Sequence, residues 1–287
     1  MPLVSDVPEQ APSPAVPLTR RERRADAQAA KPTLPRRALL ARPLSIAATV
    51  AFASLVALTG YASHQFVALA VALAGFVLAW GWPLLLGLPS PRGTTAVLAI
   101  GTVLMTGTAL VTRDEPYLEW MPAALAVSVI VGFLHQLMRR DGRPRLTESV
   151  AATTSGLAVI SAGTALAPIP HVLAGEHALA ATMAGLAVGA LADPCISIPR
   201  LRKWALFIAM LGGGGAALVV SALAGAPMAG PAAMLGLFAA AISHAARRVL
   251  APLPATAMPR AQLAVAATSS LLIGVVAYAV VTSPFFA

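Results

Sequence analysis

Long apolar stretches alternate with short polar segments along most of this chain. Nine of the stretches are long enough to cross the hydrocarbon layer as a helix, which takes roughly 20 mostly apolar residues. The pattern predicts an all-α, polytopic membrane helix bundle of about nine transmembrane helices, in one membrane domain of residues 44–287. The expected spans are 44–60, 66–86, 94–111, 121–138, 148–167, 177–192, 204–224, 230–246 and 262–283.

A proline followed by an arginine stands just before an apolar stretch at five places, 35–36, 91–92, 144–145, 199–200 and 259–260. The places are 56, 53, 55 and 60 residues apart, and each interval holds two apolar stretches. This spacing predicts a two-helix hairpin repeated along the chain. A proline suits the first turn of a helix, where its missing amide hydrogen has no partner in any case. The arginine would hold that helix end among cytoplasmic headgroups.

Two of the expected hairpins share more than this spacing. Residues 150–157 and 265–272 are identical at six of eight aligned positions, and a histidine, His135 or His244, precedes the arginine pair before each. We therefore predict that the fourth and fifth spans are related by duplication, in the same orientation, to the eighth and ninth. The alternative is that selection for basic inner loops in an alanine-rich chain imitates homology.

The charges are distributed as in a membrane protein. Apolar residues make up 58% of the sequence, charged residues 11%, and the net charge is +9. If the N-terminus is cytoplasmic, 19 of the 20 lysines and arginines fall on the inner side, which fits the positive-inside rule. The distribution therefore argues against a nucleic-acid partner. Arginine outnumbers lysine 18 to 2, as in GC-rich bacterial genes, so we expect a bacterial inner membrane with the C-terminus outside.

Residues 1–43 contain eight prolines and are predicted to form a disordered, basic cytoplasmic tail. Residues 19–22 have the spacing of a capping box, so a short basic helix could run from there to Gln28. It lacks large apolar residues and would touch anionic lipid headgroups by charge alone. The plainer interpretation is a tail that fixes topology. The first span is expected to be retained rather than cleaved as a signal.

The centres of the nine expected spans contain no ionisable residue. This argues against a proton-relay antiporter, a voltage sensor or a carrier that couples ions through membrane carboxylates. A single cysteine, Cys195, excludes an internal disulfide and a multi-cysteine metal site. His171, Glu176 and His177 in one loop are weak evidence for a metal, so we predict neither a metal site nor a cofactor.

Ionisable residues collect instead at the expected cytoplasmic ends of the spans. His135 ends the fourth span, Glu148 opens the fifth, Asp193 ends the sixth and His244 ends the eighth. If the repeats pack around a common centre, these four side chains could line a cytoplasmic vestibule. It could bind a cation, a lipid headgroup, or a phosphate ester through a metal. The alternative is that each is an ordinary interfacial residue, with Glu148 at a helix N-terminus and the histidines at C-termini.

Small residues mark two spans as sites of close helix contact. Gly185 and Gly189 have GxxxG spacing, and residues 212–215 are four consecutive glycines. Such residues let helix backbones approach one another, and this is the favoured interpretation. The glycine run also weakens a helix, so local unwinding of span 204–224 beside a cavity is the second interpretation.

No motif in the sequence settles the function. The favoured interpretation is a permease-like carrier or pore for a small neutral or amphipathic solute. One alternative is a non-catalytic membrane subunit that packs against partner membrane proteins. The other is a lipid-headgroup enzyme with its site at the cytoplasmic face, although catalysis is less favoured and no catalytic residue can be named. The expected partners are the bilayer, anionic headgroups at the basic tail and, in the subunit interpretation, another membrane protein.

Overall fold

The computed structural model describes residues 36–112 and 114–286, and all regular structure within these residues is helical. Nine helical segments of this part are long and apolar enough to cross a membrane, in agreement with the predicted all-α class and the predicted number of spans. The predicted short helix at residues 19–28 lies outside the described residues. The principal helices are α2 (Pro43–Ala62), α3 (His64–Leu85), α4 (Pro91–Val111), α5 (Met121–Met138), α6 (Leu146–Thr164), α7 (Gly175–Leu191), α8 (Ala205–Ala224), α9 (Ala229–Leu250), α10 (Pro259–Leu271) and α11 (Gly274–Val281).

The last predicted span differs from the others, because it is two helices rather than one. α10 ends at Leu271, and α11 begins at Gly274. Gly274 packs against α6 so closely that a Cβ atom on it would overlap the carbonyl oxygen of Ala162. Before the break, the hydroxyls of Thr268 and Ser270 donate to carbonyls of their own helix, at 2.8 and 2.9 Å. The interruption therefore lies where the chain approaches α6 backbone to backbone.

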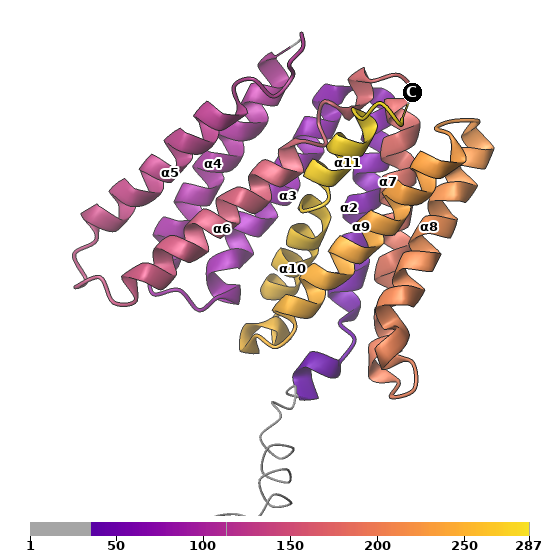
Figure 1. The fold of residues 1–287 in the computed structure, drawn as a ribbon. Helices are drawn as coiled ribbons and strands as arrows, with labels where there is room; N and C mark the ends of the chain where they lie inside the picture. Colours follow the sequence, from indigo (N-terminus) through magenta and orange to yellow (C-terminus); the bar gives the residue numbers. More distant parts are fainter. Residues whose placement is uncertain (1–35, 113, 287) are drawn as a thin grey trace, which may run out of the picture. The chain divides into compact units, whose positions relative to one another are not determined.

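The helices between Pro35 and Ala287 pack in two groups around α10 (Figure 1). One group comprises α3, α4, α5 and α6, and the other comprises α2, α7, α8 and α9. α10 contacts α3 and α6 of the first group and α2 and α9 of the second. α2 also contacts α3 directly, but its largest partner is α7, which comes much later in the chain. The apolar core extends through both groups.

Three glycines bring α7, α8 and α9 into backbone contact. A Cβ atom added to Gly185 of α7 would lie 2.5 Å from the Cα of Gly236, and one added to Gly213 of α8 would lie 2.7 Å from the Gly236 carbonyl oxygen. Only glycine fits such close approaches. α8 is a continuous helix through all four of its glycines, so local unwinding there is wrong and the packing interpretation holds.

Of the four proline–arginine pairs that lie wholly within the described residues, two open α-helices. Pro91 and Pro259 occupy the first turns of α4 and α10, as predicted. The arginine of the last pair has a partner within the chain: Arg260 Nε donates to the Trp80 carbonyl oxygen at 2.7 Å, and its guanidinium lies 4.6 Å from the centroid of the Trp80 ring. Arg260 thus ties the start of α10 to α3.

A short segment leads from the predicted tail into α2. Residues Arg36–Leu39 form a 3₁₀ turn, η1, and Ala38 is fully buried. Arg248 of α9 donates to the carbonyl oxygen of Ala38, and Arg42 donates to that of Thr256 in η5 (Pro254–Ala257). Residues 38–42, called the N-terminal strap below, are therefore held on the ends of α9 and η5.

Candidate functional site

The structure gives the four predicted vestibule residues three different surroundings. His135 lies near the end of α5, where its Nε2 is 3.2 Å from the hydroxyl of Ser90 at the start of α4. The imidazole occupies the space beside Gly93, because a Cβ atom there would overlap the ring. His135 therefore joins α5 to α4.

Glu148 lies in the first turn of α6 and is exposed. Its Oε2 accepts a hydrogen bond from Arg145 Nε at 2.6 Å, and Arg145 Nη1 donates to the Gly87 carbonyl oxygen at 2.8 Å. An exposed ion pair of this kind contributes little to stability. Glu148 thus matches the plainer interpretation of an interfacial carboxylate at a helix N-terminus.

Asp193 and His244 are the two predicted residues that the fold brings together. Asp193 Oδ1 lies 3.1 Å from His244 Nδ1, and the two residues are only 8% and 5% exposed. Asp193 follows α7 at the start of the 3₁₀ turn η3 (Asp193–Ser197), whereas His244 lies in α9. The contact therefore joins the end of one helix to the side of another.

Arg247, which is not among the four residues predicted from the sequence, completes this cluster. Its Nε donates to Asp193 Oδ2 at 2.5 Å and its Nη2 to Oδ1 at 3.2 Å, a two-pronged contact by a side chain that is 5% exposed. The predicted span ended at residue 246, so Arg247 was assigned to a cytoplasmic loop. The helix continues to Leu250. The spacing of three residues from His244, which places both on one helix face, was the available signal.

Hydroxyl groups extend the cluster to two more helices. Arg247 Nη1 donates to Ser243 Oγ on its own helix and to Ser269 Oγ of α10 at 3.5 Å. Ser269 Oγ lies in turn 3.4 Å from Thr49 Oγ1 of α2. Groups on α2, η3, α9 and α10 therefore meet at one buried polar site, which we call the Asp193 cluster. Its arginine is satisfied by charge-assisted and neutral hydrogen bonds, as a buried cation requires.

A second buried arginine occupies a similar place in the α5–α6 hairpin. The Arg139 side chain is 4% exposed and donates to Gln136 Oε1 at 2.9 Å and to Ser149 Oγ at 3.5 Å. It also donates to Asp141 Oδ2 at 2.7 Å. This hydrogen bond from Arg139 lowers the pKa of the exposed Asp141 carboxyl. In both hairpins, an arginine at the end of the first helix thus joins that helix to a serine of the next.

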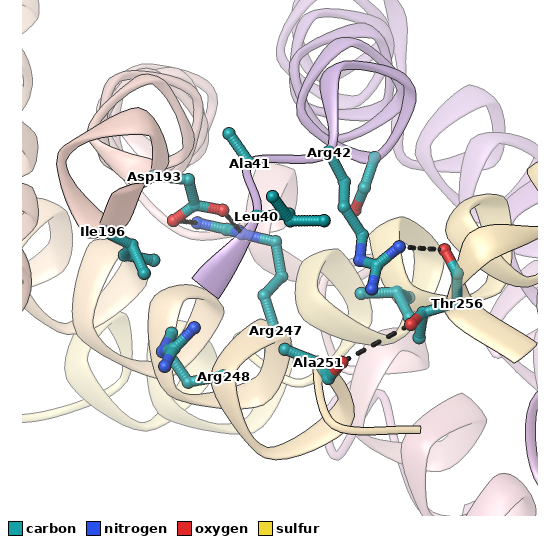
Figure 2. A pocket seen from close by; sticks show the side chains of 11 residues that line it. Leu40, Ala41, Arg42, Asp193, Ile196, Arg247, Arg248, Ala251 and Thr256 are labelled. Carbon is teal, nitrogen blue, oxygen red and sulfur yellow. Dashed lines mark hydrogen bonds and ion pairs between the residues drawn. The ribbon is translucent and has the colours of Figure 1, made fainter. Parts of the chain in front are cut away.

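A small cavity of about 30 Å³ borders the Asp193 cluster (Figure 2). Each water-sized occupant needs roughly 10–15 Å³ in this measure, so the cavity has room for about two. It lies under the N-terminal strap. Its lining comprises Leu40, Ala41, Arg42, Ser45, Asp193, Ile196, Arg247, Arg248, Ala251, Thr256 and Val265. We call it the strap cavity.

The Asp193 cluster offers little for catalysis. Among the described residues, no three histidine, cysteine or acidic side chains are grouped as metal ligands. The guanidinium of Arg247 already neutralises the Asp193 carboxylate, and the nearby hydroxyls bond to Arg247 or to main-chain carbonyls. The arrangement therefore fixes four segments to one another, and it contains no activated nucleophile.

The largest of the described cavities lies at the other ends of the helices. It has a volume of about 740 Å³, and its polar lining comes from Glu115, Tyr278, Thr282 and Ser283. An apolar groove of about 480 Å³ runs beside it between α9 and α11, lined by Met234, Phe238, Val275 and Val280 among others. The two spaces share Ser283 and Phe286. We call them the polar cavity and the α9–α11 groove.

Sequence reasoning missed both spaces. The polar cavity is built from loop residues around Pro116, Leu173 and Pro227 together with the end of α11, and no motif marks them. The break between α10 and α11 is also absent from the hydropathy pattern. No family model, curated protein or solved structure matches the chain, so its function must be argued from this geometry.

Proposed function

We propose that this chain is a multi-pass, permease-like carrier for a small amphipathic solute. The observation that supports the proposal is the junction of the polar cavity with the α9–α11 groove. One offers carboxylate and hydroxyl groups, the other is almost entirely apolar, and Ser283 and Phe286 line both. Binding sites of several hundred Å³ commonly combine an apolar wall with a few polar groups that orient the ligand. A solute with a polar head and a short apolar tail fits both spaces at once.

The opposite ends of the helices favour a carrier over an open pore. There, the Asp193 cluster and the N-terminal strap leave a space of only about 30 Å³. A site that is open on one side and closed on the other is what alternating access requires. The helix that borders the groove is interrupted between Leu271 and Gly274, and interrupted helices commonly form transporter binding sites.

The membrane and the orientation belong to the same proposal. The segments rich in arginine would lie in the cytoplasm of a bacterium, because 19 of the 20 lysines and arginines then fall on the inner side. The polar cavity, lined by Glu115, would then face outward. The carrier would accept its solute from outside the inner membrane.

The two alternative functions have less support. A packing subunit would present faces of small residues to a partner. Gly185, Gly213 and Gly236 instead pack against one another within the chain. A lipid-headgroup enzyme would need an activated nucleophile or a metal beside Asp193 and His244, but Asp193 pairs with Arg247, and the nearby hydroxyls bond to Arg247 or to main-chain carbonyls.

Uptake by purified protein in vesicles of phosphatidylethanolamine and phosphatidylglycerol tests the proposal. The probe is radiolabelled octyl glucoside below its micellar concentration, since its sugar suits the polar cavity and its tail the groove. We expect faster uptake than in protein-free vesicles, and no uptake of glucose, which lacks the tail. Ser283→Trp should remove the stimulation, because the indole fills the junction of the two spaces.

Leu223→Trp is the matched control. Leu223 lies near the end of α8, is 85% exposed, and borders neither space, so this variant should retain uptake. Uptake equal to that of protein-free vesicles, with the wild-type protein folded, would contradict a carrier for such amphiphiles and would favour the non-catalytic subunit.

A further inference from the structure

The strap cavity has a positively charged lining. Three guanidinium groups, from Arg42, Arg247 and Arg248, and one carboxylate, from Asp193, border it. Figure 2 shows that these arginines reach the cavity from different segments, the strap and α9. The lining therefore holds two more positive charges than negative ones. Charges of one sign in a partly enclosed space of low dielectric attract a counter-ion strongly.

Ser45 supplies a polar atom that the protein itself does not use. The residue is 2% exposed, and its Oγ has no hydrogen-bond partner within the described chain. Buried hydroxyls are nearly always hydrogen-bonded, so one that lines a cavity without a partner indicates an occupant. Since a hydroxyl can donate as well as accept, Ser45 can complete the coordination of an anion.

The start of α2 points to the same kind of occupant. Ser45 lies in its first turn, which contains no acidic residue, and Arg42 in the N-cap position makes no capping hydrogen bond with its side chain. The N-terminus of a helix carries a partial positive charge and unpaired amide hydrogens, which favour an anion. Burial also lowers the pKa of the Arg42 guanidinium, which means that its charge has lost solvation.

The volume limits the size of the occupant. With roughly 10–15 Å³ for each water-sized atom, a cavity of about 30 Å³ takes one or two such atoms. The four oxygens of a headgroup phosphate do not fit. A metal cation fits by size, but three arginines repel it.

We infer that the strap cavity binds one monovalent anion of the size of chloride, held between Ser45, the arginines and the start of α2. The anion would lie between the N-terminal strap and α9, and so would hold the strap closed over the Asp193 cluster. This site is separate from the polar cavity and does not depend on what the protein carries.

Thermal unfolding of the purified protein in detergent tests the inference, with sodium chloride compared with sodium gluconate at equal ionic strength. Gluconate is too large for the cavity, so chloride should raise the Tm by a few degrees, in a manner that saturates with its concentration. Ser45→Val removes the hydroxyl and fills the space, and should abolish the dependence on chloride. Ser54→Val, at an exposed position of the same helix, should keep it.

A crystal grown in sodium bromide gives a second measurement. Its anomalous signal should show a single peak beside Ser45 and Arg247. Equal Tm values in chloride and gluconate would mean that the cavity holds only water and would overturn the inference. So would a chloride dependence that survives in Ser45→Val. If that variant does not fold, Ser45→Ala, which leaves the space open, should bind chloride more weakly than wild type does.

Discussion

At the scale of single residues, Asp193 is the most constrained carboxylate among the described side chains. It accepts hydrogen bonds from His244 and Arg247 in a place that is almost closed to solvent. An ion pair so buried adds little net stability, but the loss of one partner leaves a charge without compensation. The three side chains therefore depend on one another.

Replacement of Arg247 by methionine tests this dependence. We expect Arg247→Met to lower the free energy of unfolding by about 3–5 kcal/mol, because Asp193 stays buried without its cation. The double variant Asp193→Leu with Arg247→Met should recover most of the loss. Denaturant unfolding in detergent measures both.

Arg140→Met is the matched control, since Arg140 is exposed and lies in a loop. It should leave the unfolding free energy within about 0.5 kcal/mol of wild type. A double variant as unstable as the single one would contradict the explanation by an unpaired charge.

The sequence predicted part of this site. Asp193 and His244 were among the four ionisable residues expected at the cytoplasmic ends of the spans, and the structure brings these two together. Arg247 was not among the four, because loop arginines are what the positive-inside rule leads one to expect, and the rule does not say which of them are buried. His135 and Glu148 were grouped with the others by depth alone. A residue's position along its helix does not say which side of the bundle its side chain faces. In the structure, His135 contacts Ser90 and Glu148 contacts Arg145.

At the scale of elements, glycine contacts decide how α7, α8 and α9 pack. A Cβ atom on Gly236 would overlap the carbonyl oxygen of Gly213 and meet the Cβ of Ala217. By contrast, Gly215 of the same glycine run is exposed, and an added Cβ meets nothing within 4 Å. Gly213 and Gly215, which lie two residues apart in the same glycine run, thus have different roles.

Alanine at each position separates these roles. Gly236→Ala should destabilise the protein by about 1–3 kcal/mol, the usual cost of overpacking, because backbone cannot move aside as a side chain does. Gly215→Ala should stabilise it by up to about 1 kcal/mol, through helix propensity alone. Thermal unfolding in one detergent ranks the two variants against wild type. If the two variants changed the Tm equally, α8 and α9 would have room for a Cβ atom at Gly236, against this explanation.

Hydropathy predicted the helices well because each long helix coincides with an apolar run, of the kind that a membrane-spanning helix needs, and such runs are visible in the sequence. It could not predict the break before Gly274, which depends on the Ala162 carbonyl of a distant helix. The duplication of the α5–α6 and α9–α10 hairpins stays a prediction. The buried Arg139 and Arg247, each bonded to a serine of the following helix, support it.

At the scale of the whole molecule, the distribution of lysines and arginines predicts on which side of the membrane each loop and terminus lies. We predict that an export-active reporter fused after Ala287 works and that a reporter active only in the cytoplasm is silent there. The same two reporters inserted after Arg140, between α5 and α6, should give the opposite results and serve as the control. Reversed signals at both positions would place the arginine-rich loops outside.

The arrangement of α2 has a consequence for the synthesis of the protein. Its largest partner, α7, begins at Gly175, 113 positions after α2 ends at Ala62. At about 5–20 residues per second, the ribosome needs roughly 6–23 s to reach the start of that partner. α10, whose Ser269 meets the buried Thr49, comes later still. Until then, the face of α2 that the finished protein buries lacks these partners. The first of the long helices to be synthesised is therefore among the last to reach its native surroundings.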